Sequence, residues 1–382
     1  MLPEDWKKRS VAEVCRSVSV GVVIKPSQYY VSASEGIKAF RSANVKEGQV
    51  NNSDWVYFSH KGHNENKKSE LKTGDVLVVR TGYPGTACVV TPQYAGCNAI
   101  DVVIARPDIQ KIIPTYLCLF TNSEYGKSQV ANLQGGMAQK HLNVGAYQQV
   151  EIPLPPLPEQ KKIAAILSTW DRAIDGTEKL LANSQQQKKA LMQQLLTGKK
   201  RLPGFTGEWK SSTLAACCKP QQWATISSKD LTFSGFPVYG ANGFIGYFSE
   251  YNHENDTVAV TCRGSTCGTV SLIKGPSYIT GNSMCLDQVK KDCSHIYLYY
   301  YLNHRGLKDI ISGSAQPQIV GKAIQKVSVQ LPTLPEQKAI ASALTTADEE
   351  ITALESDLSR LRQEKKALMQ QLLTGKRRVT VD

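Results

Sequence analysis

The stretch KKALMQQLLTGK occurs twice in the chain, first at Lys188–Lys199 and again at Lys365–Lys376. The motif LPEQ precedes each copy, beginning at Leu157 and at Leu334. An ungapped comparison of the two 45-residue blocks that contain these motifs gives 27 identical positions, far more than chance allows. Because a repeat of this kind decides how a chain is organised, the sequence predicts two copies of one plan, each with a variable and a constant segment.

Weaker similarity joins the segments outside these blocks. LPEDWK at Leu2–Lys7 resembles LPGFTGEWK at Leu202–Lys210, and RTGYPGT at Arg80–Thr86 resembles RGSTCGT at Arg263–Thr269. We therefore divide the chain into a first variable domain, a central constant spacer, a second variable domain, a C-terminal constant spacer and a short tail, at 1–156, 157–201, 202–333, 334–378 and 379–382.

Each constant segment has the signals of one long helix. Pro158 and Pro335 follow proline-rich stretches and suit the first helical turn, with a glutamate next to each at the positive end of the helix. Gly198 and Gly375 follow the last apolar residues and suit a left-handed helix end. The first segment is thus expected to be helical over Glu159–Leu196, and its counterpart over the equivalent residues.

The apolar residues of both helices recur at alternating spacings of three and four, which is typical of a coiled-coil seam. The seam of the second copy is regular, whereas the middle of the first copy is polar, so the weaker seam is expected to pack on the stronger one. The predicted packing residues are Leu167, Trp170, Ile174, Leu181, Leu191, Leu195, Leu344, Ile351, Leu354, Leu358, Leu361, Leu368 and Leu372.

The two variable segments have a different texture. Short β-branched runs such as Val76–Arg80 and Thr257–Cys262 are bounded by Gly, Pro, Asn or Asp, which indicates strands and turns. Helical patterns occur at Thr115–Asn122 and His295–His304. Each variable segment is therefore predicted to be a compact α/β domain.

The composition of the 382-residue chain restricts its function. Lys and Arg total 45 and Asp and Glu total 33, a net charge of +12, which favours a polyanionic partner such as nucleic acid. No run of about 18 apolar residues is present and the N-terminal stretch has no apolar signal core, so we expect no membrane partner and a cytoplasmic location. The ten cysteines include no CxxC pair and the histidines no HxxxH pair, which predicts free buried thiols and no metal site.

Much of the positive charge lies near the ends of the constant helices. The ten cations there are Lys188, Lys189, Lys199, Lys200 and Arg201 in the first copy and Lys365, Lys366, Lys376, Arg377 and Arg378 in the second. Their duplication at equivalent places favours contact with DNA phosphates. The alternative is a solvated helix end that is stabilised by the helix dipole.

Two arginines and two polar loops are candidates for reading DNA bases. Arg80 and Arg263 each end a β-run and enter a glycine-rich turn, which suits an arginine presented to a base edge or a phosphate. The alternative for each is an ion pair with an aspartate of its own domain. Gln139 and Gln316 lie in matching glycine-bounded loops, where an amide can read adenine or serve ordinary turn geometry.

Catalytic motifs are missing from the sequence. There is no phosphate-binding GxxxxGK[ST] loop, no amino-methyltransferase motif and no recognisable triad. Glu70-Leu71-Lys72 resembles part of a nuclease centre, but no Pro-Asp precedes it at a suitable distance. We therefore expect a protein that binds DNA without catalysing a reaction on it, although an enzyme with unrecognised motifs stays open.

The chain as a whole resembles the specificity subunits of type I restriction-modification systems. The resemblance rests on PLPPLPEQKKIAAIL with KKALMQQLLTGKKRLPGF, on their C-terminal copies, and on the PVYGANGFIGYF, RGSTCGTV and ITGNS stretches of the second variable segment. It covers essentially the full chain. The first variable segment departs most from the pattern, so its base contacts are the least transferable from the family.

The resemblance implies that each variable domain recognises one half of a split, asymmetric target in double-stranded DNA. It also implies that the two helices pack antiparallel as a spacer and dock two methyltransferase subunits, which translocase-nuclease subunits then join. S-adenosylmethionine, ATP and magnesium would bind those partners, so no cofactor is expected on this chain. The candidate DNA-contacting residues are Arg80, Tyr83, Asn98, Gln139, Lys140, His141, Lys199, Lys200, Arg201, Tyr239, Asn242, Arg263, Ser265, Asn282, Gln316, Gln318, Lys376 and Arg377.

Two related interpretations stay open. The chain could be the specificity subunit of a related restriction system outside type I, which only its neighbouring partners would distinguish. It could also be a coiled-coil adaptor that binds DNA without reading its sequence, in which case binding would be equally weak on all sequences.

Overall fold

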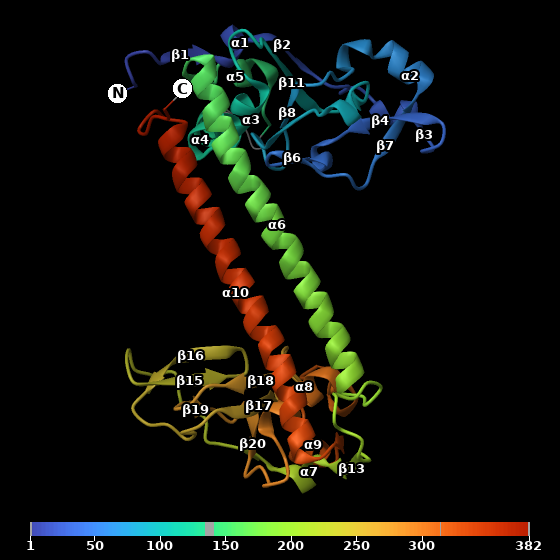
Figure 1. The fold of residues 1–382 in the computed structure, drawn as a ribbon, viewed down its shortest axis with the longest axis vertical. Helices are drawn as coiled ribbons and strands as arrows, with labels where there is room; N and C mark the ends of the chain where they lie inside the picture. The colour runs from blue at the N-terminus through green and yellow to red at the C-terminus, as the bar shows by residue number, and fades with distance from the viewer. Residues whose placement is uncertain (1, 134–140, 314, 381–382) are drawn as a thin grey trace. The chain divides into compact units, whose positions relative to one another are not determined.

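The computed structural model describes residues 2–133, 141–313 and 315–380. The chain divides into two compact units, which are Met1–Thr177 with Asp357–Asp382, and Glu178–Ser356. Two helices of 39 residues each, α6 (Leu157–Leu195) and α10 (Leu334–Leu372), contribute residues to both units (Figure 1). The prediction of two long helices that begin at the LPEQ motifs is therefore confirmed.

Unit 1 contains the first variable domain. Its main sheet has the strand order β2-β11-β8-β9, and α3 packs on it through β9. A second sheet has the order β10-β4-β7-β3, and two short ladders join β1 with β12 and β5 with β6. The strands are β1 (Lys7–Ser10), β2 (Cys15–Val20), β3 (Tyr30–Val31), β4 (Gly36–Phe40), β5 (Val45–Lys46), β6 (Gln49–Val50), β7 (Val56–Ser59), β8 (Val76–Val79), β9 (Ala87–Val89), β10 (Asn98–Ala99), β11 (Val102–Pro107) and β12 (Glu151–Leu154). The α-helices are α1 (Val11–Val14), α2 (His60–Glu65), α3 (Pro114–Asn122), α4 (Glu124–Leu133) and α5 (Val144–Gln148).

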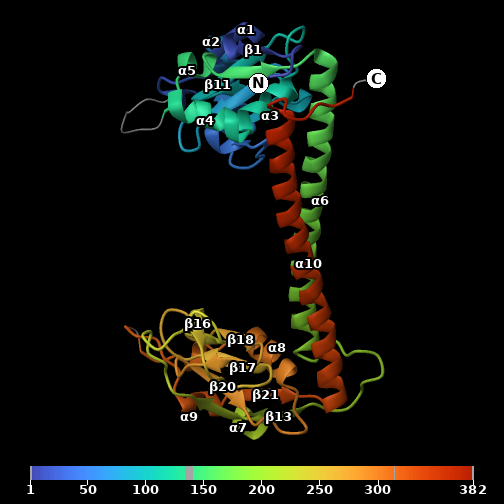
Figure 2. The same ribbon diagram turned by 90° about the vertical axis from the view of Figure 1, so that its left-hand side faces the viewer.

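Unit 2 contains the second variable domain. Its main sheet has the order β14-β20-β17-β18 and is covered by α8 (Figure 2), a smaller sheet has the order β16-β15-β19, and β13 pairs with β21. The strands are β13 (Lys210–Thr213), β14 (Lys219–Gln222), β15 (Phe236–Gly240), β16 (Gly243–Phe248), β17 (Thr257–Thr261), β18 (Val270–Ile273), β19 (Tyr278–Ile279), β20 (Ser283–Asp287) and β21 (Ser328–Leu331). The α-helices of this domain are α7 (Leu214–Cys217), α8 (His295–Arg305) and α9 (Gly321–Gln325).

The two domains repeat one topology. In each, a four-stranded antiparallel sheet stands beside a two-stranded ladder that joins the start of the domain to the strand before the long helix. The pairs in the main sheets are antiparallel, and parallel pairing among the described strands is confined to β4 with β10 and β15 with β19. The predicted duplication and the mixed helix-and-strand fold are confirmed.

The LPEQ motif attaches each domain to the start of its helix. The Gln160 side chain accepts a hydrogen bond from the Ile113 amide at 3.0 Å and donates one to the Pro155 carbonyl at 2.9 Å. Gln337 repeats the first contact with the Ser294 amide at 2.9 Å. Both glutamine side chains are buried, so these bonds are protected from water. The duplicated motif thus has a structural role at each domain–helix junction.

The residues predicted to form the helix seam are withdrawn from solvent to different degrees. Leu167 and Leu372 lie in the core of unit 1, and Leu195 and Leu344 lie in the core of unit 2. The other predicted packing residues are buried or half-buried as well, and none is exposed; they are Trp170, Ile174, Leu181, Leu191, Ile351, Leu354, Leu358, Leu361 and Leu368.

Polar residues at seam positions of one helix form ion pairs or hydrogen bonds with acidic side chains of the other helix. In unit 1, Lys365 of α10 forms an ion pair with Asp171 of α6. In unit 2, Lys188 of α6 forms the equivalent pair with Asp348 of α10. Nearby, Ser184 donates a hydrogen bond to the Glu350 side chain at 3.0 Å. As the residue numbers increase along α6, the numbers of their contact partners on α10 decrease. The two helices are therefore antiparallel within each unit.

Both helices end as the sequence predicts. Gly198 has a φ of +69° and Gly375 a φ of +73°, which is the left-handed conformation that glycine adopts without a steric penalty. A side chain at Gly375 would also meet the ring of Pro3 at 2.6 Å. The close approach ties the end of α10 to the N-terminal segment within unit 1.

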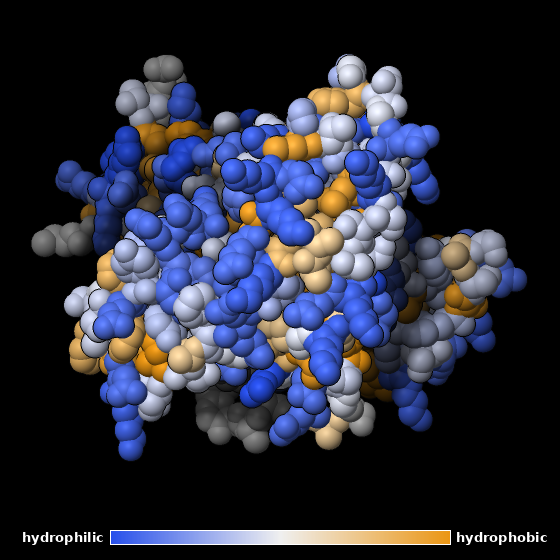
Figure 3. Space-filling model, turned by 90° about the horizontal axis from the view of Figure 1, so that it is seen from below, coloured by the Kyte–Doolittle hydropathy of each residue, from blue (hydrophilic) through white to orange (hydrophobic). Residues whose placement is uncertain are grey.

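All ten cysteines are free thiols; eight of them are buried, and Cys15 and Cys267 are half-buried. No helix among the described residues is long and apolar enough to cross a membrane. On the face of the molecule seen in Figure 3, hydrophilic residues predominate and the hydrophobic ones form small separate groups.

Candidate nucleic-acid interface

Two of the predicted loops meet in unit 2. Arg263 and Gln318 are partners in an antiparallel β-bridge, and the Gly264 amide donates a hydrogen bond to the Pro317 carbonyl at 3.2 Å. Both bridge residues are exposed. The Arg263 side chain makes no hydrogen bond or ion pair with any residue in the described ranges. The fold thus places a free guanidinium beside a free amide on one surface.

Unit 1 contains the same pair of loops, but in a register that the sequence comparison missed. The Leu142 amide donates to the Arg80 carbonyl, just as the Ile319 amide donates to the Cys262 carbonyl in unit 2. The strand residue that corresponds to Arg80 is therefore Cys262. Thr81, which bridges His141, corresponds in turn to Arg263.

This one-residue offset reverses the side chain, because neighbouring residues of a strand point to opposite faces. Arg80 is only 8% exposed, and its guanidinium donates to Asp101 at 2.5 Å and to the Leu142 carbonyl at 2.9 Å. It also contacts the ring of His141. The alternative interpretation of Arg80, an ion pair within its own domain, is the one that the structure shows. The equivalence of Arg80 and Arg263 inferred from sequence is wrong.

Asn98 is not available to DNA, which corrects its place among the candidates. The side chain is fully buried, with its oxygen 2.5 Å from the His63 ring and its nitrogen 3.1 Å from the Ser69 hydroxyl. A buried amide needs such partners. Asn98 is a structural residue that fastens β10 to the turn around Ser69.

The cations at the helix ends divide into two groups. Five of the ten form ion pairs within the structure, namely Lys188, Arg201, Lys365, Lys366 and Arg378. The other five, Lys189 and the candidates Lys199, Lys200, Lys376 and Arg377, are exposed and form no ion pair with the described residues. Half of the charge concentrated at the helix ends therefore serves the fold, and the other half is open to a ligand.

Arg201 belongs to the structural group, which corrects its assignment as a phosphate contact. Its guanidinium donates two hydrogen bonds, at 2.5 and 2.6 Å, to the Glu336 carboxylate, which is 1% exposed. These hydrogen bonds raise the pKa of Arg201. Arg201 also lies over the Trp209 ring, with 5.6 Å between the guanidinium carbon and the ring centre. Arg378 repeats this arrangement in unit 1 with Glu159 and the Trp6 ring.

Two other candidates lie around one cavity in unit 2. Tyr239 and Asn242 line a cavity of about 460 Å³, together with Thr261 and Ser271. The Asn242 side chain accepts a hydrogen bond from the Thr266 hydroxyl at 2.9 Å. The cavity is therefore lined mainly by small or polar residues, including Lys274.

The remaining candidates are placed as follows. Tyr83 is 84% exposed, and Ser265 and Gln316 are exposed, whereas Asn282 is half-buried. His141 is exposed but holds Arg80. Gln139 and Lys140 lie outside the described residues.

The β15–β16 hairpin carries an aromatic surface that is not among the candidates predicted from sequence. Phe244 is 53% exposed and Tyr247 is 37% exposed, with 5.1 Å between their ring centres. In the loop that precedes β15, Phe233 is fully exposed. The apolar run around Phe244, set between glycines, was the signal that could have indicated this surface.

Comparison with known proteins agrees with this geometry. The family model described as "Type I restriction modification DNA specificity domain" matches the chain twice, over residues 3–183 and 206–361. A Methanocaldococcus jannaschii protein assigned as the MjaX type I restriction enzyme specificity subunit is 23% identical over 415 residues, covering 99% of this chain and 95% of that protein.

Solved structures share the fold. The crystal structure of a type I restriction-modification S subunit from M. genitalium superposes with a TM-score of 0.67 at 16% identity, covering 98% of both chains. A chain from a structural study of complex assembly in the type I restriction-modification system has a TM-score of 0.59 at 19% identity, covering 99% of this chain and all of that one. The duplicated domain and its family match lead to one conclusion: the chain belongs to the family of type I restriction-modification DNA specificity proteins.

Proposed function

We propose that this chain is the DNA-recognition subunit of a type I restriction-modification complex and that each domain recognises one half of a split target. The observation that carries the proposal is the double family match over two domains of one topology. The domains differ in sequence and in the side chains at equivalent loop positions, Thr81 in one and Arg263 in the other. The two half-sites should therefore differ, which makes the target asymmetric.

Recognition divides between two kinds of contact. Arg263 and Gln318 present a guanidinium and an amide, the groups that form paired hydrogen bonds with guanine and adenine edges in the major groove. Lys199, Lys200, Lys376 and Arg377 supply sequence-independent contacts with phosphates. Arg80, Asn98 and Arg201 belong to the framework that holds these groups.

Catalysis is assigned to partner subunits. In this proposal, two methyltransferase subunits bind the specificity chain, and translocase-nuclease subunits join them. S-adenosylmethionine, ATP and magnesium would bind to those partners. The absence of catalytic sequence motifs supports this division of labour.

The first prediction tests that division. The purified chain, incubated with DNA, S-adenosylmethionine, ATP and magnesium, should leave the DNA neither methylated nor cut, because it supplies recognition alone. Adding the methyltransferase partner should produce methylation at one split sequence. Methyl transfer by the chain without its partner, measured with a labelled methyl donor, would contradict the proposal.

The second prediction concerns the free cations of the helix ends. Changing Lys199 or Lys376 to Gln should weaken binding of the assembled complex to all DNA sequences by the same factor. The slope of log affinity against log salt should fall by about one unit for each phosphate that the variant no longer neutralises. Lys179→Gln, at an exposed position in the middle of α6, is the matched control and should leave the slope unchanged. A changed target sequence in either test variant would contradict the assignment to phosphates.

A further inference from the structure

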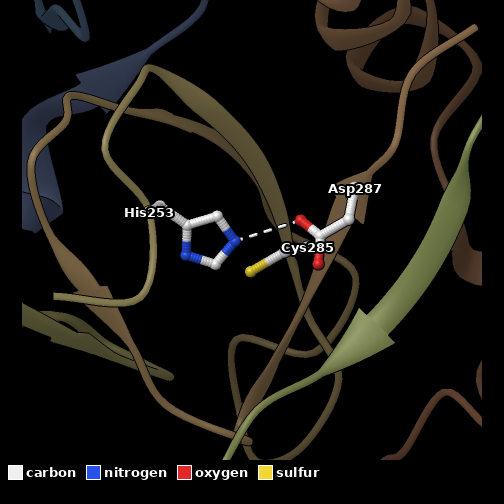
Figure 4. Close-up of side chains that lie close together, drawn as sticks. All are labelled: His253, Cys285 and Asp287. Carbon is white, nitrogen blue, oxygen red and sulfur yellow. Dashed lines mark hydrogen bonds and ion pairs between the residues drawn. The ribbon is translucent and has the colours of Figure 1, made fainter.

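Three side chains with metal-binding atoms converge in unit 2 (Figure 4). His253 lies in the loop between β16 and β17, and Cys285 and Asp287 lie two residues apart on β20, so that they share one face of the strand. Their ligand atoms all lie within 4.8 Å of one another. His253 is 8% exposed and Cys285 is fully buried.

The protonation of the His253 ring follows from its neighbours. The Asn252 side chain donates to the Ile279 carbonyl at 3.0 Å and accepts from the Ile279 amide at 2.9 Å, which fixes which end of the Asn252 amide is oxygen. That oxygen lies 2.6 Å from Nδ1 of His253. Nδ1 must therefore carry a hydrogen, because the oxygen can only accept. In a neutral ring this leaves Nε2 as a bare acceptor.

Nε2 points at another acceptor. It lies 3.0 Å from Oδ1 of Asp287, and Oδ2 of the same carboxylate accepts a hydrogen bond from the Trp223 indole at 2.9 Å. Two lone pairs facing each other in a buried place are repulsive unless a cation lies between them. The cation can be a proton on Nε2 or a metal ion, and the adjacent Cys285 sulfur supplies a third ligand atom for a metal ion.

We propose that His253, Cys285 and Asp287 form a binding site for Zn²⁺. Imidazole, thiolate and carboxylate are all zinc ligands, and the mixed nitrogen, sulfur and oxygen set disfavours magnesium and calcium. With zinc bonds of about 2.0–2.2 Å, tetrahedral nitrogen and oxygen ligands stand about 3.3 Å apart, so the observed 3.0 Å separation needs only a small adjustment. The Cys285 sulfur, which lies within 4.8 Å of the other two ligand atoms, would close to about 3.6 Å from them on binding. A cavity of about 480 Å³, lined by His253 and Asp287, leaves room for water as a fourth ligand.

The neighbours of the site support the assignment. Zinc-bound histidines donate their second ring hydrogen to an oxygen that orients the ring, and bound carboxylates are themselves hydrogen-bonded. Asn252 and Trp223 perform these two functions here. Burial raises the pKa of the Cys285 thiol, so zinc must displace its proton on binding. The bound ion would fasten the loop before β17 to β20, within the domain that carries Arg263.

Cobalt substitution of the full-length chain tests the proposal. The protein is stripped with a chelator and titrated with Co²⁺ alone, then with Zn²⁺ alone in competition. We expect one Co²⁺ per chain, a sulfur-to-cobalt absorption band in the near ultraviolet, and displacement of that band by one equivalent of Zn²⁺. A folded wild-type chain that gives no such band would overturn the proposal.

Variants assign the band to this site. Cys285→Ser should abolish it, and Asn252→Ala should weaken metal affinity about 10- to 100-fold, since it removes only the orienting oxygen. Cys218→Ser is the matched control, because Cys218 is also a buried free thiol but lies in a different core cluster. Circular dichroism establishes that each variant is folded. A band that persists in Cys285→Ser, or disappears in Cys218→Ser, would place the metal elsewhere and refute the assignment.

Discussion

Replacing Arg263 with alanine is expected to relax recognition of one half-site while leaving the other unchanged. Arg263 is exposed and lies beside Gln318, and its side chain forms no hydrogen bond or ion pair with the described residues. A paired arginine contact with a base contributes about 1–3 kcal/mol of discrimination, which corresponds to a loss of about 5- to 150-fold in affinity for the cognate sequence. Affinity for non-specific DNA should change little by comparison.

Arg80→Ala is expected to have the opposite outcome. Its guanidinium holds Asp101 and the Leu142 carbonyl inside the first domain, and Asp101 has a positive φ of +47° that those contacts help to maintain. Leaving these groups unpaired should lower the free energy of unfolding by about 1–3 kcal/mol. The half-site sequence should stay the same wherever the protein is folded.

The two variants are compared by thermal unfolding and by methylation mapping with the partner methyltransferase. Arg263→Lys provides a further control, because it keeps the charge but removes the paired geometry of the guanidinium. If Arg263→Ala lowered stability and left the target intact, Arg263 would be structural. If Arg80→Ala changed the target of a stable protein, the buried pair would have a role in recognition.

The contrast between these arginines illustrates what sequence alone can establish. The duplicated helices and their ends were predictable because heptad spacing, proline and glycine act locally. The register of Arg80 was not predictable, because aligning similar residues around the glycines hid a one-residue offset. The offset is revealed by the backbone hydrogen bonds, since Leu142 pairs with Arg80 whereas Ile319 pairs with Cys262. In a strand, that offset separates a buried side chain from an exposed one.

Burial and long-range pairing account for the other differences. Asn98 and Arg201 looked like surface groups, but each has its partners far away in sequence, at His63 and Glu336. The His253, Cys285 and Asp287 cluster escaped the search for zinc motifs because its ligands come from a loop and a strand 32 residues apart rather than from close pairs. Such contacts follow from the fold and leave no local signal.

Lengthening both long helices by four residues is expected to change the target itself, by widening the gap between its half-sites. The insertion repeats Ser184–Gln187 within α6 and Glu349–Thr352 within α10. These sites match across the antiparallel pair, since Lys188 contacts Asp348 and Ser184 contacts Glu350. Treating the two helices equally preserves the contacts on either side of the insertion.

The size of the change follows from helix geometry. Four residues add about 6 Å at 1.5 Å per residue, and DNA rises about 3.4 Å per base pair. If the helices set the spacing of the half-sites, the gap should lengthen by one or two base pairs. The half-site sequences should stay unchanged, because neither domain has been altered.

Rotation distinguishes this insertion from a shorter one. Four residues exceed one helical turn by about 40°, close to the rotation of one base-pair step, which is about 34–36° for 10–10.5 base pairs per turn. Two residues would instead rotate one end of the helix by about 200°, so a matched two-residue insertion should lose specific methylation although the protein folds. Methylation mapping with the partner methyltransferase gives the gap directly. An unchanged gap in the four-residue variant would show that α6 and α10 do not measure the target, because their length would have changed without effect.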